Sequence, residues 1–339
     1  MKILLYTEFE KQMSNSGLGK AIKHQIKALE ENNIDYTLDP KDDYDIIHIN
    51  WYGPKSFMMA NEARKKGKKI VYHAHSTEED FKNSFLLSNQ IAPLFKKWIC
   101  KCYSLGDHII TPTPYSKRLL ESYGLSNISA ISNGVDTTFF NKDEVLGNKF
   151  REMYNFKKDD KVIVGIGLYI ERKGILDFVE LAKRLPDYKF IWFGYTDLKL
   201  VPKKIKEAVK TKLPNLLFPG HVDKEIIKGA LSGADLYIFP TFEETEGIPI
   251  LEACACKQNC IIRDIPVFSG WLEDGINVYK AKDVDDFEIK IRKIMNKELP
   301  SLTEEGYKVA LSRDSKKVGK DLIKVYEDLM NSEVITKEN

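Results

Sequence analysis

The stretch DLYIFPTFEETEGIPILEACACKQNCIIRDI, residues 235–265, places a helical run between two short apolar runs. The apolar runs at 235–240 and 259–265 are rich in aromatic and β-branched residues, which favour buried strands. Between them Gly247 permits a tight turn, and Pro249 suits the first turn of a helix. This order of strand, helix and strand is typical of a parallel sheet built from β-α-β units.

The same alternation extends outward along the chain. Further strands are predicted at 2–7, 45–50, 68–75, 107–113, 128–132, 161–169, 189–196 and 215–220. Helical periods separate them, and a polar, charged stretch at 139–161 is interpreted as a linker. The pattern predicts two doubly wound, Rossmann-like domains at 1–150 and 151–315, with a last helix at 316–339 that is able to pack back on the first domain. Such folds bind ligands beyond the carboxyl ends of their strands, so we expect a ligand cleft between the domains.

The composition is that of a soluble globular protein. Of 339 residues, 43% are hydrophobic and 30% charged, and the net charge of +2 argues against general affinity for nucleic acids. The opening run is too short for a signal peptide, and no apolar run is long enough to cross a bilayer. Five cysteines without a secretion signal predict reduced thiols in the cytosol.

Two acids, Glu244 and Glu252, stand on either side of the turn at Gly247. Carboxylates accept hydrogen bonds from vicinal hydroxyls, so this pair could hold a sugar-containing ligand. A structural explanation of Glu252 stays open, because an acid in the first turn of a helix is favoured by the helix dipole.

Glycines follow two predicted strands, and they are candidates for close approach to a phosphate. Gly17 and Gly19 precede the first helix, and Gly165 and Gly167 close the strand at 161–169. Glycine lets the backbone approach a phosphate at a helix N-terminus, but a tight β-α turn needs glycine in any case. Both interpretations remain open.

Arg172 and Lys173 stand just before Gly174 at a predicted helix start. Two cations beside a positive helix end are unfavourable, and a bound polyanion would remove that conflict. We therefore favour diphosphate binding over a solvated surface pair.

A metal site is not expected. His73 and His75 alternate on a strand and share a face, but no third ligand has suitable spacing. Asp43 and Asp45 precede a strand instead of closing one, so they are interpreted as loop residues. The paired cysteines also lack the spacing of a zinc site.

The helix predicted at 91–104 mixes aromatic and cationic residues, among them Lys96, Lys97, Trp98 and Lys101. Basic amphipathic helices with aromatic residues lie on anionic membranes. From the pattern alone, an ordinary helix packed on the sheet explains these residues slightly better.

Several motifs together resemble glycosyltransferase family 4, the retaining enzymes of GT-B architecture. They are the pair of acids eight positions apart, NGVDTTFF (133–140), VGIGLYIERKG (164–174) and FPGHVDKEIIKGALSGADLYIFP (218–240). The resemblance covers nearly the whole chain. It implies a sugar-nucleotide donor, no required cofactor and no metal.

The resemblance also implies roles for single residues. Glu252 would bind the ribose and Glu244 the transferred hexose, while Lys173 and Arg172 would neutralise the diphosphate. Arg172 would replace an arginine that the family carries where this chain has Leu168. His75 would lie near the anomeric centre and the acceptor. Further contacts to the nucleotide sugar are expected from Gly167, Gly247, Ile248 and Asn133.

Other stretches resemble one bacterial subgroup of that family. DPKDDYDIIHIN (39–50), HSTEEDFKNSF (75–85), APLFKKW (92–98) and TPTPYSK (111–117) are similar to synthases that add a second hexose to monoglucosyl-diacylglycerol. The implied reaction moves glucose or galactose from a UDP-sugar to this glycolipid at the inner face of an anionic membrane. Gly17, Gly19 and His75 would border the acceptor sugar.

Two other functions stay open. One is the same chemistry on a soluble or polyprenyl-linked glycan, and the other is a nucleotide-sugar epimerase. The sequence does not fix the oligomeric state.

Overall fold

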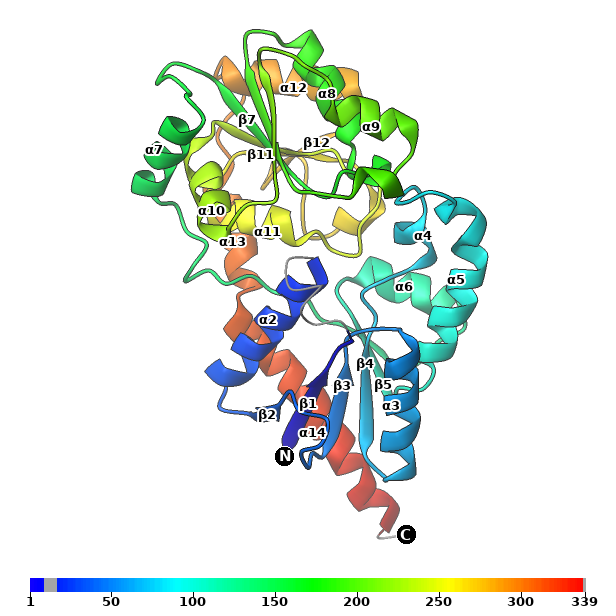
Figure 1. The fold of residues 1–339 in the computed structure, drawn as a ribbon. Helices are drawn as coiled ribbons and strands as arrows, with labels where there is room; N and C mark the ends of the chain where they lie inside the picture. The colour runs from blue at the N-terminus through cyan, green and yellow to red at the C-terminus, as the bar shows by residue number, and fades with distance from the viewer. Residues whose placement is uncertain (9–16, 338–339) are drawn as a thin grey trace. The chain divides into compact units, whose positions relative to one another are not determined.

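The computed structural model describes residues 1–8 and 17–337. Two compact units make up the chain, as the ribbon in Figure 1 lets the reader follow by colour. The first unit comprises Met1–Phe81, Gln90–Gly134 and Arg313–Asn339, and the second comprises Lys82–Asn89 and Val135–Ser312.

The first unit contains a six-stranded parallel sheet in the order β2-β1-β3-β4-β5-β6. Its strands are β1 (Lys2–Tyr6), β2 (Asp35–Thr37), β3 (Ile46–Ile49), β4 (Lys69–His73), β5 (His108–Thr111) and β6 (Ile128–Ala130). Its helices are α2 (Gly17–Glu31), α3 (Pro54–Lys65), α4 (Glu78–Phe81), α5 (Ser88–Tyr103), α6 (Pro114–Ser122) and α14 (Ser315–Lys337).

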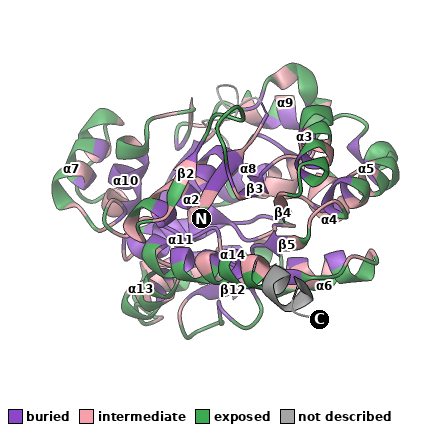
Figure 2. Cartoon of the chain, turned by 90° about the horizontal axis from the view of Figure 1, so that it is seen from below, coloured by how far each residue is buried: buried purple, intermediate pink, exposed green. Residues whose placement is uncertain are grey.

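Helices cover both faces of this sheet. Successive strand residues point to opposite faces, and the apolar side chains on each face pack against helices. Val71 packs with Leu322 and Tyr326 of α14 on one face, whereas Tyr72 packs with Ile99 of α5 on the other. The helices carry buried purple faces and exposed green faces in Figure 2. Both faces of the sheet are therefore core.

The helix α14 packs against α2. Gly319 permits this packing, since an added Cβ would lie 2.6 Å from the carbonyl oxygen of Ala28. The hydroxyl of Ser315 donates to Glu31 at 2.9 Å. The C-terminal helix thus belongs to the first unit although it follows the second in sequence.

The second unit repeats the architecture in the order β12-β11-β10-β7-β8-β9. Its strands are β7 (Val162–Ile166), β8 (Lys189–Phe193), β9 (Leu216–Gly220), β10 (Leu236–Phe239), β11 (Cys260–Arg263) and β12 (Tyr279–Ala281). Its helices are α7 (Glu144–Met153), α8 (Ile175–Arg184), α9 (Lys203–Val209), α10 (Lys224–Gly233), α11 (Ile248–Ala255), α12 (Val284–Met295) and α13 (Thr303–Ser312), with short 3₁₀ turns η1 (Glu171–Lys173), η2 (Leu198–Leu200) and η3 (Pro266–Phe268). The predicted α/β class with two doubly wound parallel sheets is confirmed.

The stretch 139–161 is not a linker. It contains α7, which packs on α10 so closely that a Cβ added at Gly233 would lie 2.4 Å from the carbonyl oxygen of Gly147. Lys228 and Asp143 form an ion pair of 3.2 Å between the same helices. The main segment of the second unit consequently runs from Val135 to Ser312, whereas the sequence predicted a boundary at 151.

Within the described residues, no helix is both long enough and apolar enough to cross a membrane.

Candidate active site

A cluster of charged side chains lies in the second unit where the chain leaves β7 and β10. The 3₁₀ turn η1 carries Arg172 and Lys173, and Gly174 then turns the chain into α8 with φ +78°. The ammonium of Lys173 forms a short ion pair with the carboxylate of Glu244, and the guanidinium of Arg172 lies 3.7 Å from the same carboxylate. Two cations thus surround one acid.

Glu244 is buried, with 6% of its surface exposed. Burial favours the neutral carboxyl, but the charges of Lys173 and Arg172 outweigh this effect and lower the pKa of Glu244. The hydroxyl of Thr241 adds a hydrogen bond of 2.8 Å to the same carboxylate. Glu244 is therefore held as an anion.

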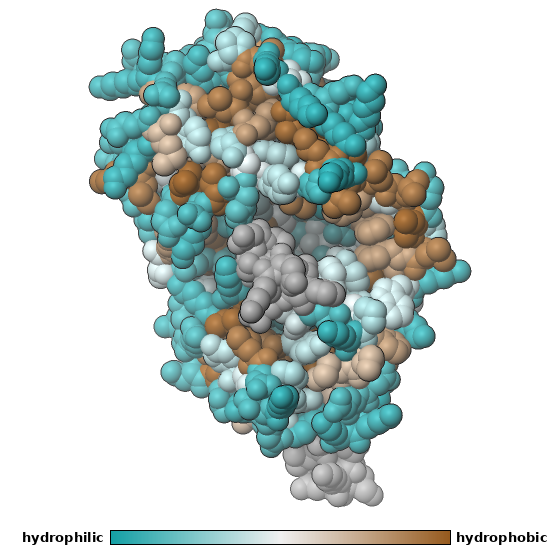
Figure 3. All heavy atoms as spheres, in the orientation of Figure 1, coloured by the Kyte–Doolittle hydropathy of each residue, from teal (hydrophilic) through white to brown (hydrophobic). Residues whose placement is uncertain are grey.

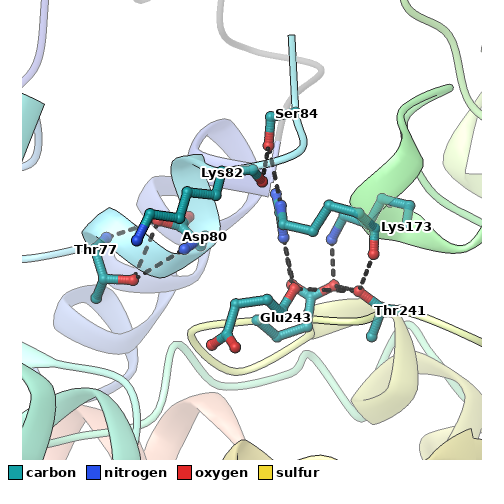
Figure 4. A network of polar contacts seen from close by, with 9 residues as sticks. Thr77, Asp80, Lys82, Ser84, Lys173, Thr241 and Glu243 are labelled. Carbon is teal, nitrogen blue, oxygen red and sulfur yellow. Dashed lines mark hydrogen bonds and ion pairs between the residues drawn. The ribbon is translucent and has the colours of Figure 1, made fainter. Parts of the chain in front are cut away.

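Arg172 is fixed by a segment from far along the chain. Its backbone amide donates to the carbonyl of Asn83 at 3.0 Å, and its Nε donates to Ser84 Oγ at 3.1 Å. Another of its nitrogens donates to the carbonyl of Glu243 at 2.7 Å. Figure 4 shows Ser84 on one side and Glu243 and Thr241 on the other, and Arg172 donates to both Ser84 and the carbonyl of Glu243.

Thr241 and Ser84 were not predicted as members of the site. A threonine after a strand and a serine in a polar loop are common, and no spacing in the sequence marks either residue as a partner of the cluster.

The turn before α11 is as the sequence predicted, with one correction. Gly247 adopts φ +94° as the N-cap of α11, and Ile248 is its first residue. Glu252 lies one turn further in, since no acid occupies the first turn of this helix, and it is fully buried. The explanation of Glu252 as a helix-start acid is therefore wrong.

Gly167 follows β7 directly and has almost no room for a side chain. A Cβ there would meet the indole of Trp192 at 3.2 Å and the side chain of Lys173 at 3.4 Å. Its carbonyl accepts the indole N–H of Trp192 at 2.8 Å. Leu168, next along the chain, is 39% exposed. Because Gly167 has no side chain of its own, the backbone fits closely against Trp192 and Lys173 at this point.

The remaining predicted residues belong to the first unit. His75 follows β4 and is half-buried, and its ring stacks on His73 with 4.0 Å between centroids. Asn133 is buried near the end of the segment that leads out of this unit. Gly17 and Gly19 lie inside the first turn of α2 and not in the turn before it. Ser16, which opens the SGLGK motif, lies outside the described residues.

The cationic helix α5 does not present all its predicted membrane residues outward. Trp98 packs against the core and donates its indole N–H to the carbonyl of Tyr52 at 2.7 Å. Lys96 pairs with Glu78 at 3.4 Å and lies 4.0 Å above the ring of Tyr123. The prediction that Trp98 contacts a membrane is therefore wrong, because its ring packs against the core of the first unit.

The outer face of α5 instead combines exposed aliphatic and cationic side chains, namely Ile91, Leu94, Lys97 and Lys101. Leu94 is 67% exposed and Ile91 44%. Figure 3 shows brown side chains gathered at the right-hand edge, where Figure 1 places the start of this helix. We call these four residues the α5 face.

No group of three or more histidine, cysteine or acidic residues suited to holding a metal ion occurs among the described residues. The five cysteines are free thiols.

Comparison with known proteins assigns a family to each part of the chain. The family described as glycosyl transferases group 1 matches residues 148–309, and Glycosyltransferase Family 4 matches residues 22–139. A processive diacylglycerol alpha-glucosyltransferase of Acholeplasma laidlawii is 40% identical over 97% of this chain and 99% of its own length. An alpha-galactosylglucosyldiacylglycerol synthase of Streptococcus pneumoniae is 22% identical over 84% of this chain and 78% of its own.

Solved structures share the fold. Anabaena HepE in complex with UDP-glucose has a TM-score of 0.78 at 15% identity, covering 97% of this chain and 100% of that one. Sucrose-phosphate synthase of Thermosynechococcus elongatus has a TM-score of 0.72 at 16% identity, covering 96% and 81%. With two parallel sheets, a match to both family domains and a relative of 40% identity, the chain belongs to the family 4 glycosyltransferases of GT-B architecture and is an enzyme that transfers sugar.

Proposed function

We propose that this enzyme moves glucose or galactose from a UDP-sugar to monoglucosyl-diacylglycerol, forming a dihexosyl-diacylglycerol with retention at the anomeric carbon. The observation that carries the acceptor is the 40% identity, over nearly the full length of both chains, to a diacylglycerol glucosyltransferase. The cluster of Lys173, Arg172 and Glu244 supports the donor, because two cations against one acid leave a surplus of positive charge.

The surplus charge suits a diphosphate leaving group. When the anomeric C–O bond breaks, negative charge develops on the diphosphate, and fixed positive groups stabilise it. Lys173 and Arg172 stand just before α8, and α11 begins at Ile248 after its N-cap Gly247, so both helix N-termini add partial positive charge. In this proposal no metal ion is needed to balance the leaving group.

Retention follows if the acceptor attacks from the side that the diphosphate leaves. A new C–O bond then forms between the anomeric carbon and the acceptor hydroxyl, and the hydroxyl proton passes to the departing diphosphate. Glu244 would orient the hexose through its hydroxyls, and Glu252 would bind the ribose. The first unit would supply His75 to the acceptor side, with Gly17 and Gly19 near the acceptor sugar.

The acceptor is a membrane lipid, so we propose peripheral association with the inner face of an anionic membrane. The α5 face supports this proposal with aliphatic side chains beside lysines, which is the composition of interfacial helices. Phe85, Leu86 and Leu87, just before α5, are also exposed.

A donor and acceptor panel tests the function. UDP-glucose and UDP-galactose are each offered with monoglucosyl-diacylglycerol, with a soluble glucoside and with a polyprenyl-linked glycan, and the product linkage is read by NMR. We expect transfer to the glycolipid with an α-linked product. Transfer to the polyprenyl-linked glycan alone would overturn the acceptor, a β-linked product would overturn retention, and a changed sugar nucleotide without transfer would indicate an epimerase.

A further inference from the structure

Six polar side chains form a continuous chain through the core of the first unit. They are Tyr326 of α14, His48 of β3, His73 of β4, Gln25 of α2, and Asn50 and His75, which follow β3 and β4. Ile49 pairs with Tyr72 in the sheet, and neighbouring residues on a strand point to opposite faces. His48 and Asn50 flank Ile49, and His73 follows Tyr72. These three side chains therefore lie together on the face of the sheet that α2 and α14 cover.

Close contacts join the chain from end to end. Tyr326 Oη lies 2.6 Å from His48 Nδ1, and His48 Nε2 lies 3.1 Å from His73 Nδ1. Gln25 Nε2 lies 2.9 Å from His73 Nδ1 and 2.8 Å from Asn50 Oδ1. His75 Nε2 lies 2.9 Å from Asn50 Oδ1.

Stacking fixes the planes of the three imidazole rings. His48 and His73 lie 5.2 Å apart at 7°, and His73 and His75 lie 4.0 Å apart at 2°. Burial lowers the pKa of His48 to about 3, and burial together with His48 lowers the pKa of His75 to about 3. Burial and the two neighbouring rings also lower the pKa of His73 well below its ordinary value. All three rings are therefore neutral at pH 7, and each carries one N–H and one acceptor nitrogen.

Donor and acceptor roles then follow from one end to the other. With the Gln25 amide oriented so that its Nε2 also donates to Asn50 Oδ1, His73 Nδ1 accepts from Gln25 and from His48 Nε2. The proton of His73 then lies on its Nε2, which is buried without a hydrogen-bond partner among the described residues. His48 Nδ1 is in turn an acceptor, and it receives the hydroxyl of Tyr326.

The other end follows the same rule. Asn50 Oδ1 accepts from Gln25, and Asn50 Nδ2 donates back to Gln25 Oε1 at 2.9 Å. His75 Nε2 therefore donates to Asn50 Oδ1, and His75 Nδ1 is left as an acceptor. Reversing one member would place two donors or two lone pairs face to face, so the chain reverses only as a whole.

We propose that this chain positions His75 for the transfer reaction, by holding its ring in the tautomer that presents Nδ1 as a hydrogen-bond acceptor to a sugar hydroxyl. Tyr326 is the anchor at the far end of the chain, and the C-terminal helix thereby acts on the acceptor side of the enzyme. This inference rests on the proposed function only for the role of His75, because the order of donors and acceptors follows from the contacts, from the neutral rings and from the orientation of the Gln25 and Asn50 amides.

Orienting the sugar hydroxyl and removing its proton are separate tasks in this proposal. Burial lowers the pKa of His75, and a ring that resists protonation is a weak base, so in this proposal His75 orients a hydroxyl through Nδ1 and the proton passes to the departing diphosphate. Tyr326, His48, His73, Gln25 and Asn50 are positioning residues, since they act through His75.

Imidazole NMR of the full-length protein, labelled with ¹⁵N at histidine, tests the chain directly. The His75→Gln and His48→Gln variants assign the two rings. We expect both rings in the wild-type protein to carry their proton on Nε2. A proton on Nδ1 of His75, or a mixture of tautomers, would overturn the proposal.

Two variants of α14 separate positioning from packing. Tyr326→Phe removes one hydroxyl, so we expect mixed tautomers at His48 and His75 and a fall in kcat of about three- to tenfold, the size expected for one hydrogen bond, with KM for the UDP-sugar unchanged. Leu322→Ala, in the buried face of the same helix, should lower Tm more than Tyr326→Phe does but keep the wild-type tautomers and kcat.

Failure of this inference is distinct from failure of the proposed function. Unchanged kcat in Tyr326→Phe despite mixed tautomers would remove the positioning role, and so would an equal loss of kcat in Leu322→Ala. If no glycolipid accepts sugar from the wild-type protein, the proposed function fails, while the NMR result still decides the order of the chain.

Discussion

Gly174 packs directly against the carbonyl oxygen of Pro240, and a Cβ built on Gly174 would lie 2.2 Å from that oxygen. The contact joins the start of α8 to the end of β10, and with φ +78° only glycine fits there without strain. Lys173 directly precedes Gly174, and Glu244 follows Pro240 by four residues. The contact between Gly174 and Pro240 therefore also sets the distance between Lys173 and Glu244.

Gly174→Ala should therefore lower both stability and turnover. The methyl group must push β10 and η1 apart, which disturbs the ion pair at Glu244, and we expect kcat to fall by at least tenfold together with a clear loss of Tm. Gly270→Ala is the matched control, because Gly270 has φ +82° but nothing within 4 Å of an added Cβ. Its cost should be about 1 kcal/mol with normal turnover. Equal effects of the two variants would show that the contact with Pro240 is unimportant.

Lys173→Met should destabilise the protein in a pH-dependent way. Removing one partner leaves a buried carboxylate poorly compensated, at a cost of about 3–5 kcal/mol at pH 7. The pKa of Glu244 is lowered in the folded wild type, so its contribution is present above the ordinary value of 4.5 and is lost as pH falls further. In the variant Glu244 is protonated more easily, so the gap from wild type should narrow between pH 7 and pH 4.

Urea unfolding at several pH values measures this gap. Lys203→Met is the control, because that ammonium is 88% exposed in its pair with Glu207. Its effect should stay within about 0.5 kcal/mol at every pH. A gap for Lys173→Met that does not vary with pH would contradict the charge argument.

The neutral histidines predict acid sensitivity of the first unit. His48 and His75 have their pKa lowered from 6.5 to about 3, so below pH 6.5 the unfolded chain binds protons that the folded chain does not. Stability should fall with decreasing pH by up to about 1.4 kcal/mol per pH unit for each ring. His48→Gln should reduce this slope between pH 6.5 and pH 4, whereas His221→Gln should not, since His221 is exposed. An unchanged slope in His48→Gln would contradict a neutral, buried ring.

The α5 face predicts where lipid binding is lost. Leu94→Asp combined with Lys97→Glu should weaken flotation with vesicles that contain an anionic lipid, because it removes an exposed aliphatic group and reverses a charge. Val145→Asp, at an aliphatic residue of α7 that is 64% exposed, is the matched control. If the double variant binds vesicles as well as the wild-type protein does, the α5 face is not the membrane contact, and α5 is an ordinary helix packed on the sheet.

Metal removal should leave the reaction intact. In the proposed mechanism Lys173, Arg172 and two helix N-termini supply the positive charge for the leaving group, so EDTA should not change kcat. Initial rates with EDTA, with and without added magnesium, check this. Inhibition that magnesium reverses would contradict a reaction that depends on these cations alone.

The sequence by itself determined the two parallel sheets, because apolar runs and helical periods alternate along nearly the whole chain. It also predicted the turn at Gly247 and selected Arg172, Lys173 and Glu244, which the structure brings together in loops that follow β7 and β10. The edge strands β2 and β12 were not predicted, because three residues are too few to show the alternation of apolar and polar residues that is typical of a strand. The polar composition of 139–161 concealed α7, whose contact with α10 depends on two glycines far apart in sequence.

Only the tertiary structure decided which side chains meet. The stretch DIIHIN displays His48 and Asn50, but their partners Gln25 and Tyr326 come from helices whose polar positions look like any others. Ser84 accepts a hydrogen bond from Arg172, which is 88 positions away in the sequence. Trp98 packs inward, although the lysines beside it in the sequence had suggested a membrane-binding helix. Periodicity records which face of an element is buried, whereas the partner across that face is set by packing between segments distant in the chain.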